Sequence, residues 1–109
     1  MKNLDVYDAM IALVPQVERK GKTMLYTSAN GYMFSQLNKA GEIGIRLPKP
    51  RQAEFIDEHG AGPFLSYGAV MRDYVLIPAH LHNDIDLLAA TLAESYAYVM
   101  SLPPNPGKK

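Results

Sequence analysis

Apolar residues recur at helical spacing near both ends of the chain. At the start they predict a helix over residues 4–14, which Asn3 caps and Pro15 ends. At the end they predict a longer helix over residues 84–101, with Asn83 as its cap. One apolar stripe leads into and along this last helix and is expected to face the core: Leu81, Ile85, Leu88, Leu92, Tyr96 and Val99.

Between these helices the pattern changes to that of β-strands. Residues 23–28, 32–37 and 42–47 are rich in residues that favour strands, and Asn30-Gly31 separates the first two segments. Asn-Gly readily adopts the positive φ angles that a tight hairpin turn requires. In the third segment Ile43, Ile45 and Leu47 alternate with other residues, which indicates one buried face. The sequence therefore predicts an antiparallel meander of three strands.

The remaining segments predict a short helix over residues 50–58 and two more strands over 64–67 and 70–77. The order α-β-β-β-α-β-β-α contains hairpins instead of βαβ crossovers, so the sheet is expected to be antiparallel. We predict a two-layer α+β domain over residues 1–102 with helices on one face of the sheet. The other face and any free edge are candidate contact surfaces. The proline-rich residues 103–109 are expected to form a disordered tail.

Length and charge narrow the class of protein. The chain has 109 residues, enough for one domain, and 11 Lys and Arg balance 11 Asp and Glu. A protein without net positive charge is a poor candidate for binding a nucleic-acid phosphate backbone over an extended surface, so this class of function is disfavoured. The absence of cysteine excludes disulfides, thiolate metal sites and cysteine nucleophiles. No apolar run approaches the length of a membrane span, and Asp5 and Asp8 interrupt any signal peptide, so a cytoplasmic location without membrane contact is expected.

Catalytic and cofactor motifs are not evident. Serine and histidine are present, but no strand–turn–helix elbow presents a nucleophile. Gly60-Ala61-Gly62-Pro63 follows a helix instead of leading into one, so it lacks the geometry of a phosphate-binding loop. We therefore expect no catalytic residues and no cofactor, while leaving enzyme activity open because a missing motif is weak evidence.

The metal-binding candidates are His80 and His82, which lie close in sequence to Asp84 and Asp86. Two histidines two residues apart diverge in a helix or turn and align only on an extended backbone. The segment also precedes the last helix, where acidic residues favour the helix dipole. We therefore interpret these side chains as exposed residues at a helix entry and predict no metal site.

Charge is distributed unevenly along the chain. Seven of the 11 Lys and Arg lie between residues 19 and 51, among aromatic residues of the predicted meander. If Arg46 and a tyrosine share the open sheet face, weak binding of single-stranded nucleic acid becomes an alternative. The predicted binding residues are Arg46 and Arg72 on strands and Tyr98 on the last helix, where it is rotated away from the core stripe. Tyrosine is a frequent interface anchor.

Several segments, in this order and spacing, resemble the TfoX N-terminal-domain family. They are Asn30-Gly31-Tyr32-Met33-Phe34, Ile45-Arg46-Leu47-Pro48, Pro63-Phe64, the eleven residues from Gly68 to Pro78, Ala97-Tyr98-Val99 and Ser101-Leu102-Pro103-Pro104. The resemblance implies a compact α+β fold similar to secretion-chaperone-like domains. In longer members this domain is joined to a second one in a regulator of bacterial competence. No residues remain here for a second domain, so the chain looks like a stand-alone member, and the family implies no catalytic residues.

These observations favour a non-catalytic protein-interaction or regulatory module with an unknown protein partner. Two alternatives stay open: a binder of a small ligand in a pocket between the sheet and the last helix, and a weak nucleic-acid binder that uses the basic meander. A homodimer through a sheet edge or the last helix is compatible with the sequence but is not established by it.

Overall fold

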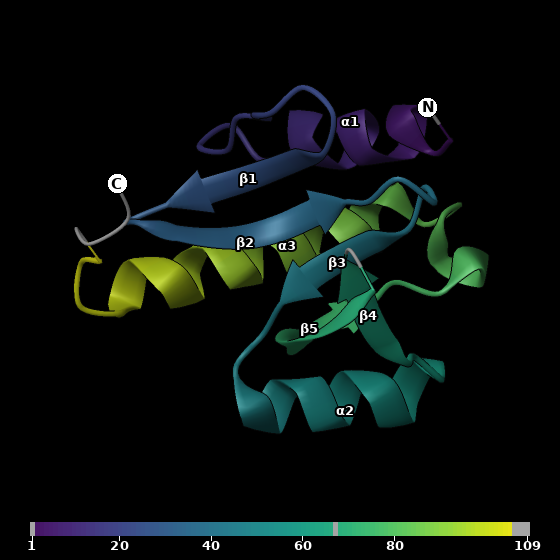
Figure 1. Cartoon of the computed structure of the whole chain (residues 1–109). Coiled ribbons are helices and arrows are strands. Elements are labelled where there is room, and N and C mark those ends of the chain that lie inside the picture. The colour runs from purple at the N-terminus through teal and green to yellow at the C-terminus, as the bar shows by residue number, and fades with distance from the viewer. Residues whose placement is uncertain (1, 67, 106–109) are drawn as a thin grey trace.

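A computed structural model describes residues 2–66 and 68–105 (Figure 1). The helices are α1 (Leu4–Ala12), α2 (Lys49–His59) and α3 (Ile85–Ser101), with a short 3-10 helix, η1 (Ala79–Leu81), before α3. The strands are β1 (Leu25–Ala29), β2 (Tyr32–Leu37), β3 (Ile43–Arg46), β4 (Pro63–Ser66) and β5 (Ala69–Leu76). The predicted α+β class and element order are confirmed. Tyr67, the last residue of one predicted strand, lies outside the described residues.

The five described strands form one antiparallel sheet in the order β1-β2-β3-β5-β4. The meander of β1, β2 and β3 is confirmed, and both Asn30 (φ 57°) and Gly31 (φ 84°) have the positive φ values expected at its first turn. Strand β5 then pairs with β3, opposing Arg46 to Tyr74 and Ile45 to Val75. Because side chains alternate along a strand, this register places Ile45 and Val75 on one face and Arg46 and Tyr74 on the other.

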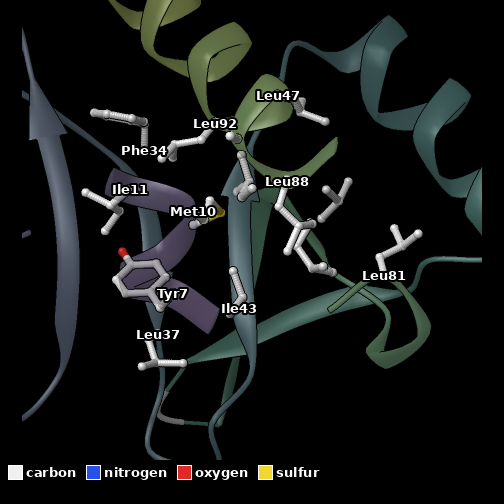
Figure 2. Close-up of a cluster of buried hydrophobic side chains, with 14 of the residues drawn as sticks. Tyr7, Met10, Ile11, Phe34, Leu37, Ile43, Leu47, Leu81, Leu88 and Leu92 are labelled. Carbon is white, nitrogen blue, oxygen red and sulfur yellow. The ribbon is translucent and has the colours of Figure 1, made fainter. Parts of the chain in front are cut away.

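The core lies where the helices meet the first of these faces. Helix α3 contacts β1, β2 and β3 and also packs against α1, while α2 contacts β5 (Figure 1). Figure 2 shows side chains of α1, the sheet and α3 in one cluster, among them Met10, Phe34, Ile43, Leu88 and Leu92, all fully buried. The predicted stripe of the last helix is therefore buried at Leu88, Leu92 and Val99, with Ile85 and Tyr96 packed at its margin.

A buried hydroxyl cluster connects α1 to the sheet. The Tyr7 and Ser35 hydroxyls lie 2.7 Å apart, and Thr27 Oγ1 lies 2.6 Å from Ser35 Oγ. All three residues are fully buried, so these hydrogen bonds satisfy groups that have no access to water. Burial raises the pKa of Tyr7, which keeps its hydroxyl neutral and able to donate.

Two predicted helix caps were wrong. Asn3 occupies the position before α1 but has a left-handed backbone, and its side chain donates to the Gly41 carbonyl at 2.7 Å instead of capping the helix. Asp84, and not Asn83, caps α3 by accepting a hydrogen bond from the Leu87 amide at 3.2 Å. A tertiary contact thus takes the Asn3 side chain away from α1, whereas at α3 the cap lies one residue later than predicted.

The second sheet face is not open as the sequence analysis expected. Phe64 from β4 and Tyr74 from β5 stack with their ring centroids 5.9 Å apart, and both are buried. Gly44 of β3 makes room for this pair, because a Cβ atom added there would lie 2.5 Å from the Phe64 ring. The β4–β5 hairpin therefore closes the centre of this face and leaves cavities around the pair.

The predicted tail begins with an ordered contact. Asn105 donates its backbone N–H to the Asn30 carbonyl at 3.1 Å, and the Tyr32 hydroxyl donates to the Pro103 carbonyl at 2.7 Å. Asn30 also donates from its side chain to the Val99 and Leu102 carbonyls, each at 2.9 Å. Residues 103–105 thus run along the β1–β2 turn, whereas residues 106–109 of the predicted tail lie outside the described residues.

Throughout residues 2–66 and 68–105, every helix is too short or too polar to cross a bilayer.

Gly44→Ala is expected to lower the free energy of unfolding by about 1–3 kcal/mol, because the added methyl group overlaps the Phe64 ring. Gly62→Ala is the matched control, since no atom lies within 4 Å of its added Cβ. Its effect should stay within about 0.5 kcal/mol. Urea denaturation of both variants measures the difference, and equal stabilities would contradict the contact between Gly44 and Phe64.

Tyr7→Phe is expected to cost about 1 kcal/mol of stability, because it removes one hydrogen bond of the buried hydroxyl cluster while keeping the ring. Tyr26→Phe is the control, since Tyr26 is only half-buried and its hydroxyl makes no hydrogen bond with any residue that the structure describes. Thermal unfolding of the two variants should separate them. A smaller loss for Tyr7→Phe than for Tyr26→Phe would show that the cluster contributes nothing to stability.

Candidate functional site

A surface groove of about 570 Å³ lies beside the Phe64–Tyr74 pair, and we call it the Arg46 groove. Its walls come from the β1–β2 turn, from β2, β3 and β5, and from Asn105 near the end of the described chain. The side chains with polar or aromatic chemistry are Tyr32, Arg46, Arg72, Asp73, Tyr74 and Asn105, and Met33 and Met71 add apolar surface. Its volume is in the range typical of ligand pockets.

Arg46 is held in this groove mainly by aromatic rings. Its guanidinium carbon lies 5.3 Å from the centroid of the Tyr32 ring and 5.9 Å from that of Tyr98. Both separations are within the range of cation–π attraction. The nearest carboxylate oxygen, on Asp73, lies 3.7 Å from a terminal nitrogen of Arg46, which is an ion-pair distance but too long for a hydrogen bond. Arg46 Nε is buried and has no hydrogen-bond partner among the described residues.

Two tyrosines that line the groove are fixed by hydrogen bonds to the backbone. Tyr32 is anchored to the Pro103 carbonyl, and the Tyr74 hydroxyl donates to the Met33 carbonyl at 2.8 Å. Burial raises the pKa of Tyr74, against a smaller opposing effect of the Arg46 charge, so Tyr74 stays a neutral donor. The groove is therefore a preformed surface whose aromatic walls are anchored by strands and by residues 103–105.

The three residues predicted to bind a partner lie around the same groove. Arg46 and Tyr98 are in contact, and Arg72 lines the groove from β5. Tyr98 is half-buried against the core instead of fully exposed, so it supports Arg46 more than it projects into solvent. The sequence analysis considered Arg46 together with a tyrosine of the meander without choosing one, and the structure identifies Tyr32 as that neighbour. Asp73 was missed as the ion-pair partner of Arg46. Asp73 precedes Tyr74, the residue that pairs with Arg46, so its place beside Arg46 follows once the β3–β5 register is known. The sequence alone does not supply this register.

A smaller cavity of about 290 Å³ adjoins the Arg46 groove, and we call it the Ile56 cavity. The two share Val70, Met71, Arg72 and Tyr74 as lining residues, so they adjoin each other along β5. Two large apolar side chains of the Ile56 cavity are exposed, Ile56 by 41% and Val70 by 56%. An apolar surface thus borders a cationic one.

The basic residues of the meander do not form an unpaired patch. Arg19 lies 3.0 Å from Asp8, and Arg51 lies 2.9 Å from Glu94. Lys20 donates to the Ser28 hydroxyl at 3.3 Å. Because acidic side chains neutralise two of these arginines, the meander carries less free positive charge than the sequence suggested. Arg72, in contrast, has no ion pair or hydrogen bond with the residues described.

The two histidines do not share a site with acidic residues. In the described parts of the chain, no three His, Asp or Glu side chains come close enough together to hold a metal ion. His80 is exposed, whereas the Nε2 atom of His82 is buried and has no hydrogen-bond partner among those residues. Burial of the ring, together with the nearby Lys2 charge, lowers the pKa of His82.

No protein-family description, curated protein or solved structure matches this chain. The resemblance to the TfoX N-terminal-domain family and to secretion-chaperone-like folds therefore stays a prediction.

His82 predicts a pH dependence of stability. Its pKa is lower in the folded protein than the value of about 6.5 in an unfolded chain, so the unfolded state binds the proton more tightly. The contribution of His82 to the free energy of unfolding is then fully present above about pH 6.5 and is lost as the pH falls below this value. His82→Gln should reduce the loss of melting temperature between about pH 7.5 and 5.5, and His80→Gln should not. Identical pH profiles for both variants would contradict the role of His82.

Proposed function

We propose that this protein is a non-catalytic protein-interaction module and that the Arg46 groove is its contact surface. A regulatory role in the bacterial cytoplasm is part of the same proposal, and it rests on the resemblance to the TfoX N-terminal-domain family. The supporting observation is the composition of the groove: two arginines, two tyrosines and two methionines line one preformed surface. Arg, Tyr and Met are enriched where proteins bind one another.

The state of Arg46 also supports this proposal. An arginine packed between rings loses little further side-chain freedom on binding, so a contact to it carries a small entropic cost. Its side chain is 20% exposed, which leaves part of the guanidinium accessible from the groove. Arg72 adds a second accessible cation on the neighbouring strand.

A small-ligand binder is the second candidate, in the Arg46 groove instead of the predicted pocket between the sheet and the last helix, because the volume of the groove would accommodate a metabolite. Nucleic-acid binding has less support, since Arg19 and Arg51 are paired with carboxylates and Asp73 contributes a negative charge to the groove itself. Self-association is a further outcome that the experiment below separates, because a second copy would be retained in place of another protein.

The test is capture of partners from native cells by the tagged protein, compared among groove variants. Arg46→Gln and Arg72→Gln each remove one cation of the groove. Lys22→Gln is the matched control, because Lys22 is exposed in the loop before β1 and does not line the groove. We expect a protein that is retained by the parent and by Lys22→Gln and is reduced at least about fivefold by both groove variants.

Circular dichroism and the melting temperature of each variant establish that it is folded. Arg72 is exposed, so Arg72→Gln gives a clear answer even if Arg46→Gln is destabilised. If the same proteins are retained equally by all four forms, the groove is not the contact surface. If none is retained by any form, the interaction proposal fails.

A further inference from the structure

We propose that the Arg46 groove and the Ile56 cavity together bind an extended acidic segment of a partner protein, with a carboxylate on the arginines and a neighbouring apolar side chain against Ile56 and Val70. This inference rests on the proposed function and specifies the chemistry of the partner. Three features of the surface support it: Arg46 makes no hydrogen bond with a described residue, Arg72 has no ion pair or hydrogen bond with those residues, and an exposed apolar cavity adjoins the groove along β5.

Arg46 has hydrogen-bonding capacity that the protein does not use. It makes no hydrogen bond with a described residue, and its only acidic neighbour, Asp73, stays 3.7 Å away with a side chain that is 49% exposed. A guanidinium forms its strongest contacts with carboxylates, in a planar arrangement of parallel hydrogen bonds. Cation–π packing against Tyr32 and Tyr98 leaves the charge in place but satisfies none of the N–H donors. An incoming carboxylate would supply acceptors to the terminal nitrogens.

Arg72 gives the lining of the groove a net positive charge. Arg46 and Arg72 contribute two positive charges and Asp73 one negative charge, a sum of +1 over the lining residues that the structure describes. Because Arg72 is exposed and has no partner among those residues, its interaction with an approaching carboxylate costs no existing ion pair. Charge complementarity therefore favours an acidic occupant over a basic one.

The Ile56 cavity explains why the occupant is a peptide segment and not a free anion. Ile56 and Val70 are exposed apolar side chains in a cavity that shares Arg72 with the Arg46 groove. A carboxylate alone would leave this apolar surface in water, whereas an apolar side chain on the same segment would bury it at about 25 cal/mol per Å². A nucleic acid would offer Ile56 sugar and base edges in place of a flexible aliphatic side chain.

The experiment is an NMR titration of the ¹⁵N-labelled protein with three probes. The first is the blocked hexapeptide acetyl-(Glu-Glu-Leu)₂-amide, which in an extended conformation carries Glu and Leu on each face, the second is acetyl-(Lys-Lys-Leu)₂-amide, and the third is inorganic phosphate. We expect the acidic peptide to shift the backbone amides of residues 70–74 and the Nε–H signal of Arg46. The basic peptide and phosphate should shift them at least about fivefold less at equal concentration.

Variants then assign the two parts of the surface. Arg72→Gln should weaken binding of the acidic peptide about five- to tenfold, and Ile56→Ser should weaken it about threefold or more. Asp73→Asn should strengthen it about two- to fivefold, because a competing carboxylate is removed. A gain of affinity cannot result from damage to the fold. Lys22→Gln should bind like the parent protein.

Each other outcome overturns the inference. Equal shifts with phosphate would indicate a simple anion site, and equal shifts with the basic peptide would indicate apolar adhesion without charge selection. Unchanged or weaker binding by Asp73→Asn would exclude the arginine–carboxylate contact. If no probe shifts these signals, the acidic-segment inference fails, while the capture experiment with Arg46→Gln and Arg72→Gln still decides the proposed function independently.

Discussion

Antiparallel pairing of β3 with β5 is the constraint on which both the core and the groove depend. It joins the meander to the β4–β5 hairpin, and its register sends Ile45 and Val75 to the helices while Arg46 and Tyr74 face the other side. A slip of one residue would exchange these sets and bury Arg46 in the apolar core. The same pairing therefore fixes a hydrophobic layer and presents a cation beside it, so the site is a direct consequence of the fold.

Close packing on the second face is the next consequence of that register. Gly44 lies two residues before Arg46 on β3, and its missing side chain lets the Phe64 ring lie against the strand. Phe64 stacks on Tyr74, whose hydroxyl reaches the Met33 carbonyl and so connects β5 to β2. The wall of the Arg46 groove is thus held by ring packing and one partly buried hydrogen bond. Rigid walls of this kind reduce the entropy lost when a partner binds.

The sequence predicted the strands and turns well, because local backbone preferences and the spacing of apolar residues determine where they form. Asn30-Gly31 determines its turn by backbone preference, and the alternation at Ile43 and Ile45 follows from the period of a strand. The two-residue period of a strand does not describe β2 at Phe34, because the β1–β2 register shifts there and the consecutive residues Phe34 and Ser35 are both fully buried. The sequence analysis did not name Asp73 as a neighbour of Arg46, because Asp73 reaches it through the pairing of β3 with β5, two strands that are far apart in the sequence.

Arg46 is a costly residue for stability alone. A partly buried guanidinium loses hydration, and here it receives one long ion pair and two ring contacts, with Nε left without an acceptor among the described residues. Apolar side chains of similar length would fill the same space without that desolvation cost. This cost is the physical reason for our proposal that a carboxylate from outside the chain contacts the terminal nitrogens of Arg46 from the groove, beside Arg72.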